Sequence, residues 1–114
     1  MARRNADEAV TRGTTNVFAD LGFADAEERQ TKLRLAHAIN QIVAERGLTQ
    51  ASAAKLLGIN QPKVSALTNY RLAGFSVERL MTLLTALDRD IDIVIRKRGR
   101  TRRAGGGRIS VKAA

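Results

Sequence analysis

Apolar residues recur every three or four positions along one stretch of the chain, which is the spacing of a helix with one buried face. Asp25 is the expected N-cap, because its carboxylate can accept hydrogen bonds from free backbone N–H groups. Glu27 and Glu28 follow it, and acidic side chains in a first turn interact favourably with the helix dipole. Gly47 supplies the stop, so the pattern predicts a helix from Asp25 to Arg46. The expected buried face consists of Leu35, Ala38, Ile39, Ile42 and Val43.

Three shorter helices are predicted after Gly47, each with its own capping residue. Thr49 can cap a helix that ends at Leu57 and is closed by Gly58. Asn60 can cap the next, whose first turn contains Pro62, a position that proline tolerates. Ser76 can cap the last. The buried stripe of this last helix is Val77, Leu80, Leu83, Leu84 and Leu87.

The apolar period changes from that of a helix to that of a strand after Leu87. Ile91, Ile93 and Ile95 occupy every second position, so they lie on one side of a predicted strand. A solitary strand is unstable in water and needs a partner. That partner is either the same strand of a second copy or the short run 109–111 of the same chain, and the sequence leaves both open.

These elements predict an all-α fold, a small helical bundle with one added C-terminal β-strand. Only 4% of the residues are aromatic, so the core must be built mainly from aliphatic side chains. We expect a flexible N-terminal arm over residues 1–15, one domain over 16–96, and a basic, disordered tail over 97–114. Within the domain, the short apolar cluster 16–23 is expected to pack onto the helices.

The two short helices carry a joint pattern of residue types that is typical of a helix-turn-helix. Its members lie at offsets of zero, four, eight, fourteen and seventeen: Gln50, Ala54, Gly58, Val64 and Leu67. Ala54 must be small where the two helices approach, and Gly58 permits the positive φ of the turn. Val64 and Leu67 fill the shared core. The motif is therefore predicted from about Gln50 to Leu67.

Charge is distributed unevenly along the chain. Residues 1–95 carry 12 basic and 11 acidic side chains, a balance of +1, whereas the whole chain carries +9. Eight basic residues and no acid lie between Arg96 and Lys112, so the high isoelectric point belongs to the tail. Residues 48–74, which include the predicted motif, contain three basic residues and no acid, as a surface that faces phosphate requires.

Several other functions are disfavoured by composition. The chain has no cysteine, which excludes a disulfide framework and a thiolate metal site, and its only histidine, His37, is expected to be exposed and inert. Asp88, Asp90 and Asp92 lack the glycine and glutamate of a calcium loop. We expect no enzyme, cofactor or metal. Without a secretory signal or an apolar run of roughly 18 residues, we expect a soluble, cytoplasmic protein with no membrane contact.

Residues 48–65 (LTQASAAKLLGINQPKVS) resemble the phage-repressor-like XRE family of helix-turn-helix proteins. Two flanking segments, 16–23 (NVFADLGF) and 74–80 (GFSVERL), resemble its HigA-like antitoxin branch, and the likeness spans residues 16–96. The resemblance implies that the helix after Asn60 enters the major groove of DNA with its N-terminal residues towards the bases. The residues implied to face the bases are Gln61, Lys63 and Ala66.

The base-facing residues have matching chemistry, since a glutamine can bond adenine bidentately and a lysine can reach guanine O6 and N7. Other side chains are expected to hold phosphates, which fixes the register on DNA without reading its sequence. These backbone contacts are Gln50, Asn60, Ser65, Thr68, Asn69 and Arg71.

The leading hypothesis is a homodimeric repressor that binds a two-fold operator on double-stranded DNA through one reading helix per chain. Its dimer contact is the strand of Ile91, Ile93 and Ile95, and the resemblance implies that it can also neutralise a cognate toxin. One alternative is a nucleic-acid packaging protein driven by the tail. Another is a toxin-binding module that uses Phe18, Leu21 and Phe23 or the strand edge and reads no operator.

Overall fold

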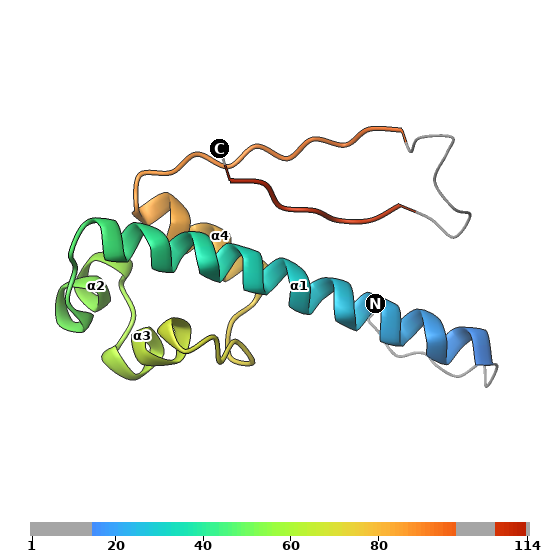
Figure 1. Cartoon of the computed structure of the whole chain (residues 1–114), viewed down its shortest axis with the longest axis horizontal. Coiled ribbons are helices and arrows are strands. Elements are labelled where there is room, and N and C mark those ends of the chain that lie inside the picture. The colour runs from blue at the N-terminus through green and yellow to red at the C-terminus, as the bar shows by residue number, and fades with distance from the viewer. Residues whose placement is uncertain (1–14, 98–106, 114) are drawn as a thin grey trace.

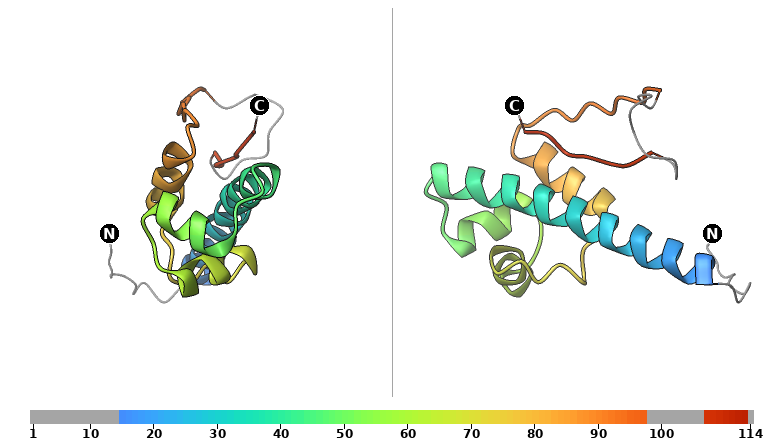
Figure 2. Two further views of the ribbon diagram at one scale, coloured as in Figure 1. Left: turned by 90° about the vertical axis from the view of Figure 1, so that its left-hand side faces the viewer. Right: turned by 45° about the vertical axis from the view of Figure 1, so that its right-hand side comes forward.

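The computed structural model describes residues 15–97 and 107–113. Four helices follow one another along the chain: α1 (Thr15–Glu45), α2 (Gln50–Leu57), α3 (Gln61–Thr68) and α4 (Val77–Ala86). The three short helices gather around the C-terminal part of α1, and the N-terminal end of α1 projects beyond them (Figures 1 and 2). The predicted helical bundle is therefore present.

The start of α1 corrects the sequence prediction. The helix begins at Thr15 rather than after Asp25, which lies inside it with its carboxylate 3.5 Å from the Arg29 guanidinium one turn later. Gly22 lies within α1, although a glycine costs a helix about 1 kcal/mol relative to alanine. The predicted cluster 16–23 is thus a continuation of the helix. The side chains of Phe18, Leu21 and Phe23, like the predicted arm 1–14, lie outside what the structure describes.

The predicted starts of the other three helices are confirmed by their caps. The Thr49 hydroxyl accepts a hydrogen bond from Ser52 N at 3.0 Å, and the Ser52 hydroxyl accepts one from Thr49 N at 2.8 Å. Asn60 Oδ1 accepts from Lys63 N at 2.9 Å, and the Ser76 hydroxyl accepts from the amide that follows it by three residues at 3.0 Å. Each cap satisfies a backbone donor that a helix leaves free at its N-terminus.

One hydrophobic core joins all four helices. The predicted stripes of α1 and α4 face it, and their flanking members Ala38, Val43 and Val77 are half-buried at its margin. Fully burying a side chain of this size stabilises the fold by about 1.5–3 kcal/mol. The most deeply buried side chains, below 2% exposure, are Ile39, Leu67, Leu80, Leu83 and Leu87.

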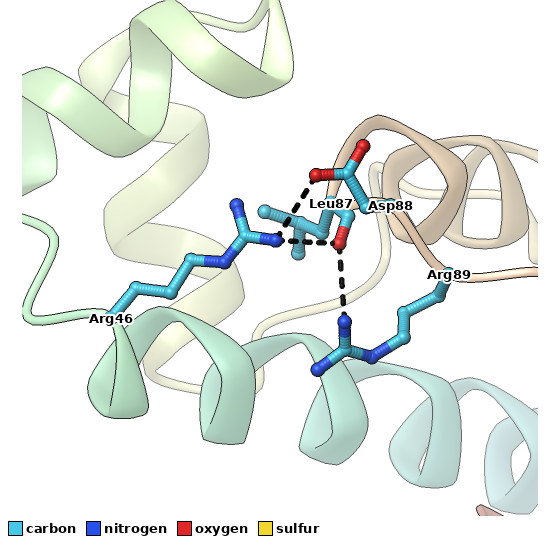
Figure 3. A network of polar contacts seen from close by, with 4 residues as sticks. All are labelled: Arg46, Leu87, Asp88 and Arg89. Carbon is cyan, nitrogen blue, oxygen red and sulfur yellow. Dashed lines mark hydrogen bonds and ion pairs between the residues drawn. The ribbon is translucent and has the colours of Figure 1, made fainter.

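The C-terminal ends of α1 and α4 are joined by a polar junction around Leu87 (Figure 3). Arg46 Nη2 donates to Leu87 O at 2.9 Å and lies 3.3 Å from Asp88 Oδ2, and Arg89 Nη1 donates to the same carbonyl at 3.4 Å. Asp88 has a φ of 64°, a left-handed conformation that aspartate tolerates better than most residues. The junction therefore sets the direction in which the chain leaves α4.

The chain beyond α4 is extended but forms no strand within the described residues. Residues 91–97 and 107–113 run in opposite directions (Figure 1), and they stand apart when viewed along the long axis (Figure 2). The second segment lies against α1, where Ile109 N donates to Glu27 Oε1 at 3.0 Å. No backbone hydrogen bond joins the two described segments. The predicted strand is thus not confirmed, because an extended segment becomes a strand only when a neighbour pairs with it.

Candidate nucleic-acid interface

The turn between α2 and α3 has the tight geometry that the sequence predicts. Gly58 has a φ of 72°, and its N–H donates to Ala54 O at 2.9 Å. The N–H of Ile59 donates to the same carbonyl at 3.1 Å, which closes the end of α2. Ala54 is only 9% exposed. A small residue and a left-handed glycine therefore let α3 follow α2 directly and fix the angle between them.

The N-terminus of α3 presents Gln61 to solvent. Asn60, Gln61 and Pro62 are all exposed, and the Gln61 amide has no hydrogen-bond partner among the described residues. The side chain of Asn60 is already engaged as the helix cap. Between Asn60 and Gln61, Gln61 is therefore the residue whose side-chain amide makes no hydrogen bond within the described structure. A side-chain amide of this kind can bond a base edge bidentately.

Lys63 is held by the loop that follows α3. Its Nζ donates to Gly74 O at 3.2 Å and lies 5.0 Å from the centre of the Phe75 ring, which is a cation–π distance. Phe75 itself is buried, so this contact fastens the first turn of α3 to the core through the loop. To reach a base, the ammonium group has to exchange these contacts for contacts with DNA.

The remaining candidates lie on α3, just after it, or at the start of α2. They differ in whether their side chains form hydrogen bonds within the protein. The Thr68 hydroxyl donates to Val64 O at 3.0 Å and the Asn69 amide donates to Ser65 O at 2.9 Å, so both point back to their own helix. Arg71 and Gln50 are exposed, whereas Ala66 and Ser65 are half-buried. The structure thus brings Gln61, Lys63 and Ala66 onto one helix, with Gln50 at the start of the neighbouring one.

Three side chains with no predicted role make contacts at the C-terminal end of α3 and in the turn after it. Asn40 Nδ2 donates to Leu67 O at 3.0 Å, and the His37 ring nitrogen Nδ1 lies 3.3 Å from the Tyr70 hydroxyl. Tyr70 has a φ of 58°, a strained conformation for an aromatic residue. An asparagine beside the buried Ile39 was the available signal for the first contact. Nothing in the local sequence indicated the second, and His37 is exposed, as expected, but not without a partner.

The predicted partner strand is the most exposed apolar part of the described chain. Ile91 is half-buried, whereas Ile93 is 74% and Ile95 is 92% exposed.

In the described part of the chain no helix is both long and apolar enough to cross a membrane. No three His, Asp or Glu side chains gather there with the geometry of a metal site.

Comparison with known proteins identifies the family. A family model described as a helix-turn-helix domain matches residues 17–96. A solved structure named as an XRE family transcriptional regulator is 68% identical, with a TM-score of 0.74, and the match covers 79% of this chain and 99% of that one. No curated protein matched. The motif, its turn and the matched range agree, and the chain belongs to the XRE family of helix-turn-helix, DNA-binding transcription regulators.

Proposed function

We propose that the protein is a homodimeric repressor that reads a two-fold operator with the N-terminal turn of α3. The observation that carries the proposal is the exposed Gln61 at the start of a helix whose neighbourhood, residues 48–74, contains no acid. A single reading helix recognises only a few base pairs. Two copies related by a two-fold axis would place their helices in half-sites about 10 bp apart or a multiple of it.

Within this proposal the candidate residues take separate roles. Gln61 contacts a base edge, with Ala66 offering a small apolar surface one turn further on. Gln50, Asn60, Ser65, Thr68, Asn69 and Arg71 line the flanking phosphates. Lys63 takes part by moving from Gly74 O to the DNA, so its contribution to affinity is reduced by the contacts it gives up.

The test is a substitution of the exposed amide with a matched control. Gln61→Ala should weaken operator binding by about 1–3 kcal/mol, roughly five- to 150-fold, and should relax the base preference at one position of each half-site. Gln41→Ala removes another exposed glutamine, on α1, and should leave binding unchanged. Equal operator affinity for the two variants would contradict the assignment of α3 as the reading helix.

A tail-driven binding mode makes a different prediction. Residues 98–114 carry six basic side chains and no acid, so they can bind phosphate without sequence preference. A chain that ends at Lys97 should keep its preference for operator over random DNA and show a shallower dependence on salt. If binding disappears altogether, the protein is a packaging protein rather than a repressor.

Neutralisation of a toxin is a second proposed role. It rests on the likeness of segments 16–23 and 74–80 to the HigA-like branch and on the position of the first segment, in the part of α1 that projects from the bundle (Figure 1). Co-expression with the product of the adjacent reading frame, followed by size-exclusion chromatography, tests it. A stable complex that persists in Gln61→Ala would separate toxin binding from operator binding.

A further inference from the structure

Residues 91–97 are an extended segment that pairs with no other part of the chain that the structure describes. Ile93, Val94 and Ile95 are 74%, 71% and 92% exposed, and no backbone group of the segment bonds to another described residue. Three consecutive β-branched residues favour a strand strongly. An exposed apolar strand with free edges is a template for pairing with another chain.

The charges of this segment are arranged symmetrically in opposite signs. Val94 is at the centre, an isoleucine lies on each side of it, and Asp92 and Arg96 follow at equal distances. A segment with this pattern is complementary to its own reverse. The occupant that it fits is therefore a second copy of itself, running in the opposite direction.

We infer that two copies pair antiparallel along residues 91–97, with Val94 opposite the partner's Val94. This register places Asp92 opposite the partner's Arg96, and symmetry repeats that pair. A parallel in-register arrangement would instead place like charges side by side, which destabilises a sheet. A shift of one residue would move the isoleucines to the other face, so the register is strongly specified. The inference rests on the proposed dimeric repressor and assigns its contact surface.

The surroundings of the segment suit this arrangement. The Arg46–Leu87 hydrogen bond of 2.9 Å fixes the point from which the segment leaves α4. Half-buried Ile91 lies beside a groove on the outer side of α4 that includes Met81 and Thr85. Glu78 and Thr82 also line the groove, and its apolar side chains are Met81 and Ile91. Because Ile91, Ile93 and Ile95 share one face of a strand, pairing would place isoleucines of the second copy on the same side as Ile91.

The nearest competing partner is residues 107–113 of the same chain. They stand apart from 91–97 (Figure 2), and their contacts are with α1 through Glu27 and Arg34. They contain Arg108 and Lys112 but no acid, so they offer no carboxylate to Arg96. A hairpin within one chain could pair Asp92 with Arg108 or Lys112 but would leave Arg96 without an acidic partner.

A charge swap tests the pairing by sedimentation of the full chain without DNA, so the result is independent of operator binding. Asp92→Arg and Arg96→Asp should each raise the dimer dissociation constant roughly tenfold or more at low salt, because both cross-strand pairs become repulsive. The double variant should recover dimerisation. An equimolar mixture of the two single variants should form heterodimers. Single variants that dimerise like the parent chain, or a double variant that stays monomeric, would overturn the inference.

A cysteine at the axis gives a second measurement. Facing residues of an antiparallel pair lie about 4.5–5.5 Å apart at Cα, within the range of a disulfide. Since the chain has no cysteine, Val94→Cys should oxidise to a covalent species of twice 12.4 kDa. Ala51→Cys, on the exposed face of α2, is the control and should remain monomeric. If Val94→Cys cross-links no faster than the control, the register is wrong.

Discussion

The helix-turn-helix and the segment that follows α4 satisfy their polar and apolar groups in opposite ways. In the helix-turn-helix the caps Thr49 and Asn60 serve donors of their own helices, and Val64 and Leu67 are buried at 4% and 1% exposure. In residues 91–97 the backbone has no partner in the described structure and Ile95 is 92% exposed. The first region satisfies its groups within one chain, whereas the described structure contains no partner for the second.

This difference separates two kinds of conformational control. The shape of the reading helix depends on contacts within a few residues along the chain and on the core of the bundle. In the proposed dimer, the position of one α3 relative to the other depends on the extended segment, whose exposed side chains contribute little to the stability of a single chain. Some substitutions should therefore unfold the helical bundle. Others should leave each bundle folded but weaken the proposed contact between two copies.

The largest effect should come from a cavity in the shared core. Leu67→Ala removes a side chain that is 1% exposed and should lower the free energy of unfolding by about 2–5 kcal/mol. Ile95→Ala, at a position 92% exposed, should change the free energy of unfolding by less than about 0.5 kcal/mol and weaken dimerisation instead. Urea denaturation of dilute protein measures the free energy of unfolding of the two variants. Similar losses of stability would show that the segment belongs to the folded core.

The sequence was sufficient to predict the helix-turn-helix because the determinants of that motif are local. Thr49, Asn60, Gly58 and the apolar spacing each act within one or two turns, and all of these predictions are confirmed. The predicted start of α1 was wrong because Asp25, although a favourable cap, also fits inside a helix, where its carboxylate lies beside Arg29. Both roles use the same residue type, so composition could not distinguish them.

The contacts of Lys63 and Tyr70 could not be predicted, because they join positions whose separation follows from tertiary packing. Lys63 was expected to be free for DNA, but its ammonium reaches Gly74 across the turn between α3 and α4. Likewise, the predicted strand at Ile91 to Ile95 depends on a neighbouring segment, and local sequence patterns do not identify that neighbour. Local patterns gave the elements, and the packing decided which side chains remain available.

A smaller effect is expected from the cap of α2. Thr49→Ala removes the hydroxyl that accepts from Ser52 N and should lower the free energy of unfolding by about 1 kcal/mol. Thr82→Ala is the matched control. The Thr82 hydroxyl donates to Glu78 O, a carbonyl four residues earlier in the same helix, so its removal should cost less than about 0.5 kcal/mol. Thermal denaturation of the two variants gives the comparison. A Thr82 variant as unstable as the Thr49 variant would argue against a specific role for the cap.

The turn glycine should have a smaller net effect still. Gly58→Ala meets no atom within 4 Å, so its only penalty is the φ of 72°, which costs a non-glycine residue about 1–2 kcal/mol. Alanine also restricts the unfolded chain, which returns about 0.4–1 kcal/mol, so the net loss should lie between about zero and 1.6 kcal/mol, with the centre of the range near 0.8 kcal/mol. Gly58→Asn should lose less than alanine because asparagine tolerates this region. Equal stability for the alanine variant and the parent would mean that the turn relaxes.

The smallest effect is expected at the polar junction between the C-terminal ends of α1 and α4, from which residues 91–97 continue. Asp88→Asn keeps a residue type that tolerates the φ of 64° and removes only the charge facing Arg46, whose side chain is 34% exposed against 85% for Asp88. Such an exposed ion pair contributes a few tenths of a kcal/mol and is screened by salt. The Arg46 hydrogen bond to Leu87 O remains, and that bond directs residues 91–97 away from α4. Stability and dimerisation should therefore both stay near those of the parent chain, at low and at high salt. A salt-sensitive loss of dimer in this variant would place the control of the segment in the charge of Asp88 rather than in the carbonyl of Leu87.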